Sequence, residues 1–168
     1  MPLPDPEALL ARLVEAMRPD VAPSCVLVGI HSGGVWVARR LHAALGIQAA
    51  LGTLDANFYR DDFGRRGLKP GVRPTELPFE VAGADVVLVD DVLFTGRTIR
   101  AALNVLFDYG RPARVRLAAL VDRGGRELPV AADWIGGRVE VPDDRMVVVE
   151  QDAAGRLALS LTERDGVA

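Results

Sequence analysis

The sequence is poor in several residue types, and each shortage narrows the class of protein. Its 168 residues include one cysteine, so no disulfide can form within the chain. Cys25 heads an apolar run, which favours a buried thiol in a reducing compartment. The N-terminus lacks the basic and apolar segments of a signal peptide, and no unbroken apolar run is long enough to span a bilayer. These absences predict a cytoplasmic protein.

Lysine and net positive charge are also scarce. Lys69 is the only lysine among 20 basic residues, and the formal net charge is -3. A mildly acidic chain argues against general affinity for nucleic acid. Apolar residues make up 49% and charged residues 26%, as in ordinary globular proteins. The length predicts a single domain over residues 1–168.

The most informative stretch runs from residue 86 to residue 98. Val86 to Val89 predict a strand buried on both faces, and Asp90 and Asp91 follow at its carboxyl end, where open α/β sheets bind ligands. Hydroxyls and backbone N–H groups then stand at the start of a helix and suit a phosphate; they belong to Thr95, Gly96, Arg97 and Thr98. Two carboxylates beside a phosphate suit sugar hydroxyls or a metal ion. The alternatives are a solvated acidic turn and simple helix capping by Thr95.

The rest of the hydrophobic pattern alternates between strands and helices. It predicts helices over 5–18, 35–45 and 98–109, strands over 26–30, 48–54 and 115–121, and a terminal hairpin of 146–150 with 157–161. Residues 55–78 and 126–146 interrupt the pattern with glycine and proline. Alternation of this kind predicts an α/β fold with a mostly parallel central sheet flanked by helices.

The stretch Val-Leu-Val-Asp-Asp-Val-Leu-Phe-Thr-Gly-Arg-Thr resembles the phosphoribosyl-pyrophosphate (PRPP) signature of type I phosphoribosyltransferases. Two further segments resemble one subgroup, the pyrimidine-operon regulator family (PyrR): Leu54 to Asp62, and Leu120 to Pro129. The resemblance implies the type I phosphoribosyltransferase fold, with a long mobile loop at 55–78 and a small hood at 122–150.

The resemblance also implies roles for the motifs. Asp90 and Asp91 would bind the ribose hydroxyls and Mg²⁺, directly or through water, and the 95–98 turn would bind the 5′-phosphate. The pyrophosphate loop would be His31, Ser32, Gly33 and Gly34, and Tyr59 and Arg60 would lie in the mobile loop. Family members carry Lys-Thr-Arg-Gly in the pyrophosphate loop, so this loop departs from the pattern by having no lysine or arginine. His31 has the alternative of an ordinary polar residue at a strand end.

Phe94 bears on the choice of base. Purine phosphoribosyltransferases carry an aspartate there that handles a ring proton, and a phenyl ring cannot do so. A pyrimidine such as uracil therefore fits better. The hood would hold the base, with Arg123 near the base or pyrophosphate and backbone groups around Ile135 to Val139 reading its edge.

The sequence thus predicts a Mg²⁺-dependent enzyme that converts uracil and PRPP to UMP and pyrophosphate. The alternative is a UMP-sensing regulator that binds leader mRNA, since the family includes such proteins. The solvent side of the first helix holds few basic residues, Arg12 and Arg18, which favours the enzyme. The resemblance also implies a homodimer or a higher oligomer.

Overall fold

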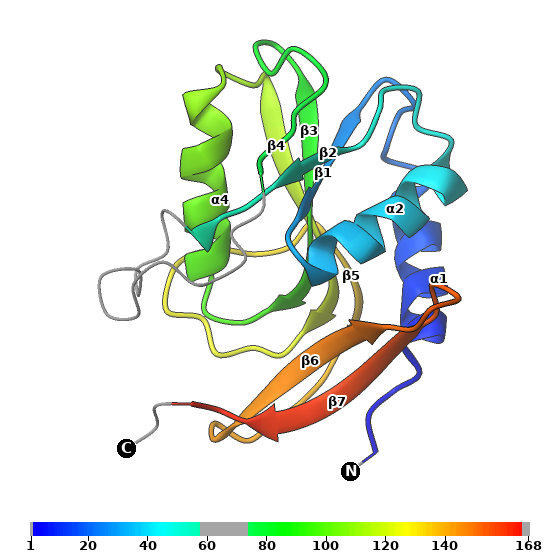
Figure 1. Ribbon diagram of the computed structural model, residues 1–168, viewed down its shortest axis with the longest axis vertical. Helices are drawn as coiled ribbons and strands as arrows, with labels where there is room; N and C mark the ends of the chain where they lie inside the picture. The colour runs from blue at the N-terminus through cyan, green and yellow to red at the C-terminus, as the bar shows by residue number, and fades with distance from the viewer. Residues whose placement is uncertain (1, 58–73, 166–168) are drawn as a thin grey trace.

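The computed structural model describes residues 2–57 and 74–165. Within these ranges, five strands form a parallel sheet in the order β2-β1-β3-β4-β5 (Figure 1). The strands are β1 (Val26–Ile30), β2 (Gly52–Leu54), β3 (Asp85–Leu93), β4 (Arg114–Asp122) and β5 (Trp134–Arg138). The predicted parallel sheet is confirmed. Because all of these strands run the same way, their carboxyl ends share one edge of the sheet.

Helices cover both faces of this sheet. They are α1 (Pro6–Met17), α2 (Gly33–Leu45) and α4 (Arg97–Asp108), and α4 lies on the face opposite to α1 and α2 (Figure 1). Asp5 caps α1 as predicted, because its Oδ1 accepts a hydrogen bond from the Glu7 N–H at 3.1 Å. Gly46 ends α2 in the left-handed region, with φ 64°.

The central strands are buried on both faces, as their unbroken apolar sequence predicts. Leu27 and Val87 pack into the cluster shared with α1 and α2, and their neighbours Val28 and Leu88 pack into the cluster beneath α4. All four side chains are at most 1% exposed. The two cores therefore clamp the middle of the sheet and hold its carboxyl edge in place.

A separate antiparallel hairpin follows the sheet, as predicted. It consists of β6 (Arg145–Gln151) and β7 (Leu157–Glu163). One ion pair anchors its turn to the helices: Glu7 Oε2 lies 2.7 Å from Arg40 Nη2. Glu7 Oε1 also accepts from the Leu157 N–H at 3.0 Å, and Arg40 donates to the Gly155 carbonyl at 3.2 Å. The hairpin is thereby attached to α1 and α2.

The structure differs from the sequence prediction in three elements. Residues 134–138 form β5, although the segment 126–146 was predicted to be irregular. β2 is shorter than predicted and covers only residues 52–54. β3 is longer and continues through both acidic residues to Leu93, because Val92 and Leu93 still pair with β4.

Most of the predicted 55–78 loop lies outside the described residues. The returning end pairs with the sheet through an antiparallel bridge between Thr53 and Glu76. In the described part of the chain, no helix combines the length and the apolar character needed to cross a membrane.

Candidate functional site

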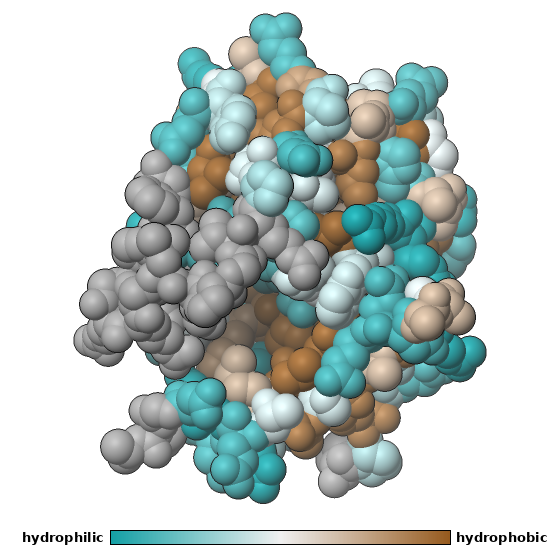
Figure 2. Space-filling model, viewed as in Figure 1, coloured by the Kyte–Doolittle hydropathy of each residue, from teal (hydrophilic) through white to brown (hydrophobic). Residues whose placement is uncertain are grey.

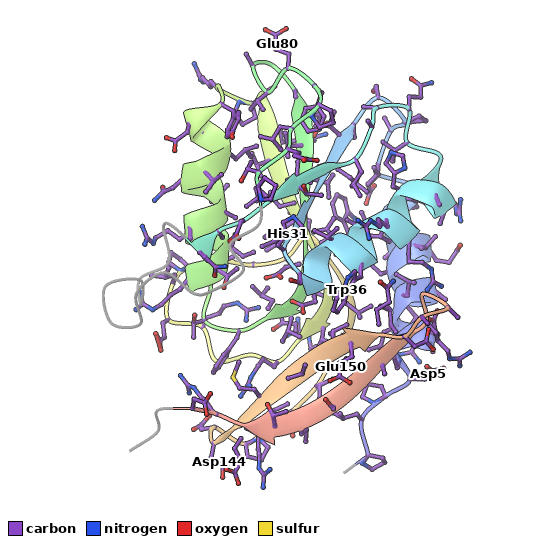
Figure 3. All side chains as sticks on the ribbon, viewed as in Figure 1. Asp5, His31, Trp36, Glu80, Asp144 and Glu150 are labelled. Carbon is purple, nitrogen blue, oxygen red and sulfur yellow. The ribbon has the colours of Figure 1, made fainter. Side chains whose placement is uncertain are left out.

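Four polar groups gather at the carboxyl edge of the sheet. His31 follows β1, Asp90 and Asp91 lie in the last part of β3, and Asp122 ends β4. Figure 3 shows His31 at the end of β1, where α2 begins. In parallel sheets this edge is the usual ligand site. The predicted site residues of β1 and β3 are therefore brought together by strand order.

The two acidic residues are held by the backbone of their own strand. Asp90 is 5% exposed, and its Oδ1 accepts from the Asp91 N–H at 2.9 Å. Asp91 is half-buried, and its Oδ1 accepts from the Val92 N–H at 2.8 Å. These bonds orient the carboxylates and leave further lone pairs for a ligand. The alternative of a solvated acidic turn does not fit two carboxylates that are buried or half-buried.

The 31–34 segment is packed against these acids. The His31 N–H donates to the Leu54 carbonyl at 2.9 Å, which ties the segment to β2. The His31–Ser32 peptide bond is cis, and α2 begins directly at Gly33 rather than after the predicted four-residue loop. A Cβ on Gly33 would lie 2.1 Å from Asp91 Oδ2, and one on Gly34 would lie 2.5 Å from the Val89 carbonyl. Only glycine therefore allows the segment to approach the acids this closely.

The 95–98 turn joins β3 to α4. Gly96 has φ 93°, which favours glycine, and α4 begins at the next residue. The predicted capping by Thr95 is wrong, because Gly96 is the N-cap residue; Thr95 Oγ1 instead accepts from the Arg97 N–H at 3.2 Å and closes the turn before the helix. The first turn of α4 carries no acidic residue, and the positive end of the helix dipole favours an anion there. The turn thus has the chemistry of a phosphate site.

Arg126 supports this turn from behind, and sequence reasoning missed it. Its guanidinium donates to the Phe94 carbonyl at 2.7 Å, to the Val130 carbonyl at 2.8 Å and to Asp122 Oδ2 at 2.7 Å. Burial alone would raise the pKa of Asp122, but the hydrogen bonds from Arg126 and the Gly124 N–H hold it below its ordinary value. The only sequence signal is the i,i+4 spacing of Asp122 and Arg126.

The predicted hood residues differ in whether they contact Phe94. Arg123 is 8% exposed, and its guanidinium carbon lies 3.8 Å from the centre of the Phe94 ring. Arg164, which sequence reasoning also missed, lies 5.0 Å from the same ring. The Ile135 side chain packs on the α4 side of the sheet, whereas Val139 packs against the α1 and α2 cluster. The structure therefore joins Arg123 to Phe94 but does not bring the side chains of Ile135 and Val139 to one face.

Other predicted residues have simpler outcomes. Tyr59 and Arg60 lie outside the described residues. Cys25 is buried, as predicted.

Figure 2 shows apolar surface set back between the β6–β7 hairpin and the strands above it. The hairpin therefore borders a recess beside the sheet.

Together, these features define an α/β protein with a parallel sheet, whose glycine-lined carboxyl edge carries two acids next to the start of a helix. The family model for the phosphoribosyl transferase domain matches residues 7–152. The chain is 54% identical over 151 residues to the bifunctional protein PyrR of Pseudomonas paraeruginosa, covering 88% of this chain and 89% of that protein. It is 48% identical over 172 residues to the bifunctional protein PyrR of Pseudomonas putida, covering 95% and 100%. The chain therefore belongs to the phosphoribosyltransferase family and, within it, to the PyrR proteins.

Solved structures agree on the fold. The hypoxanthine phosphoribosyltransferase of Trypanosoma cruzi superposes with a TM-score of 0.62 at 18% identity, covering 92% of this chain and 93% of that chain. A hypoxanthine-guanine phosphoribosyltransferase from Bacillus anthracis gives a TM-score of 0.65 at 18% identity, covering 82% of each chain. At this identity the likeness establishes the type I phosphoribosyltransferase fold, as predicted, and leaves the base to be argued from the site.

Proposed function

We propose that this protein transfers the phosphoribosyl group of PRPP to uracil, releasing UMP and pyrophosphate. The observation that carries the proposal is the meeting of three segments at one sheet edge. The acids of β3 lie against the glycines of 31–34, and three residues separate the second acid from the 95–98 turn. Their chemistry matches the ribose, pyrophosphate and 5′-phosphate of a single ligand.

Each group has a part that follows from its contacts. Asp90 and Asp91 offer oxygen lone pairs to the two ribose hydroxyls. The Thr95 and Thr98 hydroxyls and the first N–H groups of α4 offer donors to the 5′-phosphate. Gly33 and Gly34 turn backbone N–H groups of the first turn of α2 towards the pyrophosphate, and His31 adds a polar ring. Displacement at the anomeric carbon needs no covalent nucleophile, so positioning and charge stabilisation supply the rate.

A magnesium ion fits the donor set of this edge. Asp90 and Asp91 supply hard oxygen ligands, which Mg²⁺ prefers, with the rest coming from substrate oxygens and water. In the described residues no group of three or more His, Cys, Asp or Glu could enclose a metal alone. When bound with PRPP, the ion would neutralise charge on the leaving pyrophosphate.

The choice of uracil is supported by Phe94. The position carries no proton-exchanging group, and arginine side chains lie over the ring. A panel of uracil, cytosine, orotate, hypoxanthine and guanine with PRPP and Mg²⁺ tests it, with nucleotide and pyrophosphate both measured. Pyrophosphate release with uracil alone is the expected result. Release with a purine or with orotate instead would overturn the assignment.

A second function is favoured by the word bifunctional in the names of the relatives. A PyrR regulator would bind the leader mRNA of its own pyrimidine genes, promoted by UMP. RNA binding of this kind would weaken with salt, because it relies on phosphate contacts. A filter-binding titration with the organism's own leader transcript, with and without UMP, tests it. Binding unaffected by UMP and matched by an unrelated transcript would contradict it.

A further inference from the structure

Three distant segments meet at Phe94. Phe94 lies between β3 and the 95–98 turn, Arg123 follows β4, and Arg164 follows β7. The guanidinium carbons of Arg123 and Arg164 lie 3.8 Å and 5.0 Å from the ring centre, both within cation–π range. Gly125 completes the enclosure, since a Cβ there would lie 2.5 Å from the ring. The ring is therefore a platform for two guanidinium groups.

The two arginines are held by one turn of the chain. Arg123 donates to the Arg145 carbonyl at 2.7 Å and to the Pro142 carbonyl at 3.4 Å. Arg164 donates through its backbone N–H to the Asp144 carbonyl at 2.9 Å and through its side chain to the Asp143 carbonyl at 3.4 Å. Figure 3 shows Asp144 at the end of the hairpin far from Asp5. Each guanidinium group carries five N–H donors. The side-chain bonds just described use two donors of Arg123 and one of Arg164.

The positive charge at this place is not balanced by a carboxylate. None of the ion pairs between described residues includes either arginine. The Nε of Arg123 is buried and has no hydrogen-bond partner. Burial, and then the charge of Arg164, lower the pKa of Arg123, against a weaker opposite effect of Asp143. A buried charge without a counter-ion is costly, so this cluster favours a negatively charged or oxygen-rich ligand.

An exposed apolar side chain, Leu161, lies three residues before Arg164 in the chain. Leu161 pairs across the hairpin with Val147, so both side chains share the face that packs on the protein. Val147 is 5% exposed, but Leu161 is 39% exposed. Leu161 is therefore an exposed apolar side chain on the packed face of the hairpin, and Figure 2 shows further apolar surface set back between the hairpin and the strands above it. An apolar wall with charged donors is the usual lining for a heteroaromatic ring.

We propose that Arg123 and Arg164 bind the pyrimidine as its N1 anion and stabilise the charge on its ring oxygens, an inference that rests on the proposed uracil transfer. Uracil gives its N1 proton to solvent water, and the negative charge spreads over O2 and O4. The N1 lone pair then forms the bond to the anomeric carbon of PRPP. The bond from that carbon to the pyrophosphate oxygen breaks, and its electron pair leaves with pyrophosphate. The guanidinium charges thus replace the general base that Phe94 cannot be.

The acidity of the base provides the test. 5-Fluorouracil is a stronger N–H acid than uracil of nearly the same shape, so its anion needs less stabilisation. In wild type both bases are expected to react. Arg164→Gln is expected to lower kcat/KM for uracil by about 10- to 100-fold, the range for losing a charge-assisted hydrogen bond. The loss for 5-fluorouracil is expected to be several-fold smaller. Arg164→Lys, which keeps the charge, is expected to restore much of the difference.

Arg156→Gln is the matched control, because Arg156 is an exposed arginine at the opposite end of the same hairpin. An equal loss for both bases in Arg164→Gln, or no loss, would overturn the anion proposal and leave uracil transfer standing. No UMP from wild type would overturn uracil transfer itself. If Arg164→Gln does not fold, judged by circular dichroism, the ratio of kcat/KM for uracil to that for 5-fluorouracil is measured for Arg164→Lys and Arg123→Lys. These variants keep the positive charge, so the ratio is expected to stay close to that of wild type. A large fall in the ratio would also overturn the proposal.

Discussion

The close contact between Gly33 and Asp91 can be tested by adding a single methyl group to Gly33. A Cβ on Gly33 would lie 2.1 Å from Asp91 Oδ2 and 2.9 Å from Asp91 Cβ. Gly33→Ala must therefore displace the carboxylate. We expect about a 100-fold loss of kcat/KM with PRPP, comparable to Asp91→Asn, because misplacing a positioned group by about 1 Å costs that much. Steady-state kinetics measure the loss.

Gly52→Ala is the control for this substitution. Its Cβ would also be crowded, at 3.0 Å, but by the end of the Phe79 side chain and far from the acids in sequence. We expect near-normal turnover in this variant. Wild-type turnover in Gly33→Ala would show that the position of Asp91 does not matter for the reaction.

The residues that sequence reasoning found and missed differ in a physical way. Asp90, Asp91 and the 95–98 turn act through local geometry, and their spacing along the chain carries the information. Arg126 and Arg164 act on the site through contacts with Phe94, whose backbone carbonyl accepts from Arg126, 32 residues away, and whose ring lies beside Arg164. Neither contact has a period or spacing that a single sequence reveals. The positions of these two arginines at the site could therefore be found only from the three-dimensional structure.

At the scale of elements, Arg126 joins the end of β4 to the 95–98 turn. Asp122 is 6% exposed, and Arg126 is its close ion-pair partner, with Arg138 at 3.9 Å. Arg126→Met leaves that carboxylate poorly paired, so we expect a loss of about 3 kcal/mol in the free energy of unfolding. Urea denaturation measures it. The double variant Arg126→Met with Asp122→Asn is expected to recover part of the loss, and no recovery would contradict the pairing argument.

The β6–β7 hairpin depends on Glu7. The hydrogen bond from Arg40, and then that from the Leu157 N–H, lower the pKa of Glu7. A carboxyl whose folded-state pKa is lowered stabilises the fold above its unfolded-state pKa and loses that contribution as pH falls through the folded value. We expect Glu7→Gln to cost about 1 kcal/mol at pH 7, since the pair is partly exposed. The difference from wild type should shrink as the pH falls below the ordinary pKa of a glutamate.

Glu15→Gln is the matched control for Glu7→Gln. Glu15 pairs with Arg18 on the surface of the same helix, with 72% of its side chain exposed. Such pairs contribute little, so we expect almost no change in unfolding free energy. A Glu7 variant as stable as the Glu15 variant at pH 7 would contradict the anchoring of the hairpin.

The strand β5 shows why one element escaped prediction. Gly136 and Gly137 weaken the strand pattern of 134–138. The structure explains them, because a Cβ on Gly136 would lie 2.5 Å from the Leu120 carbonyl and 2.7 Å from the Leu9 carbonyl. Close approach of α1 requires glycine there. Strands with a continuous apolar sequence, such as β1 and β3, were predictable because burial on both faces leaves a local signal.

At the scale of the whole molecule, ligand binding and folding are linked. PRPP contacts proposed here come from the ends of β1 and β3 and the start of α4, which exist together only in the folded chain. PRPP with Mg²⁺ at 100 times its Kd should add about 2.7 kcal/mol to stability. For a chain of this length, that raises Tm by roughly 5–10 °C. Differential scanning fluorimetry measures the shift.

The metal and the acids make this linkage specific. Without Mg²⁺, PRPP brings uncompensated phosphate charge next to Asp90 and Asp91, so we expect the shift in Tm to fall to a small fraction of its full value. Asp91→Asn should lose most of the Mg²⁺-dependent part of the shift while keeping the Tm of the free protein. That variant loses the site without unfolding, because its carboxylate is half-buried at the sheet edge and not in either core. An equal shift with and without Mg²⁺ would place the metal elsewhere, and an equal shift in Asp91→Asn would place PRPP elsewhere on the molecule.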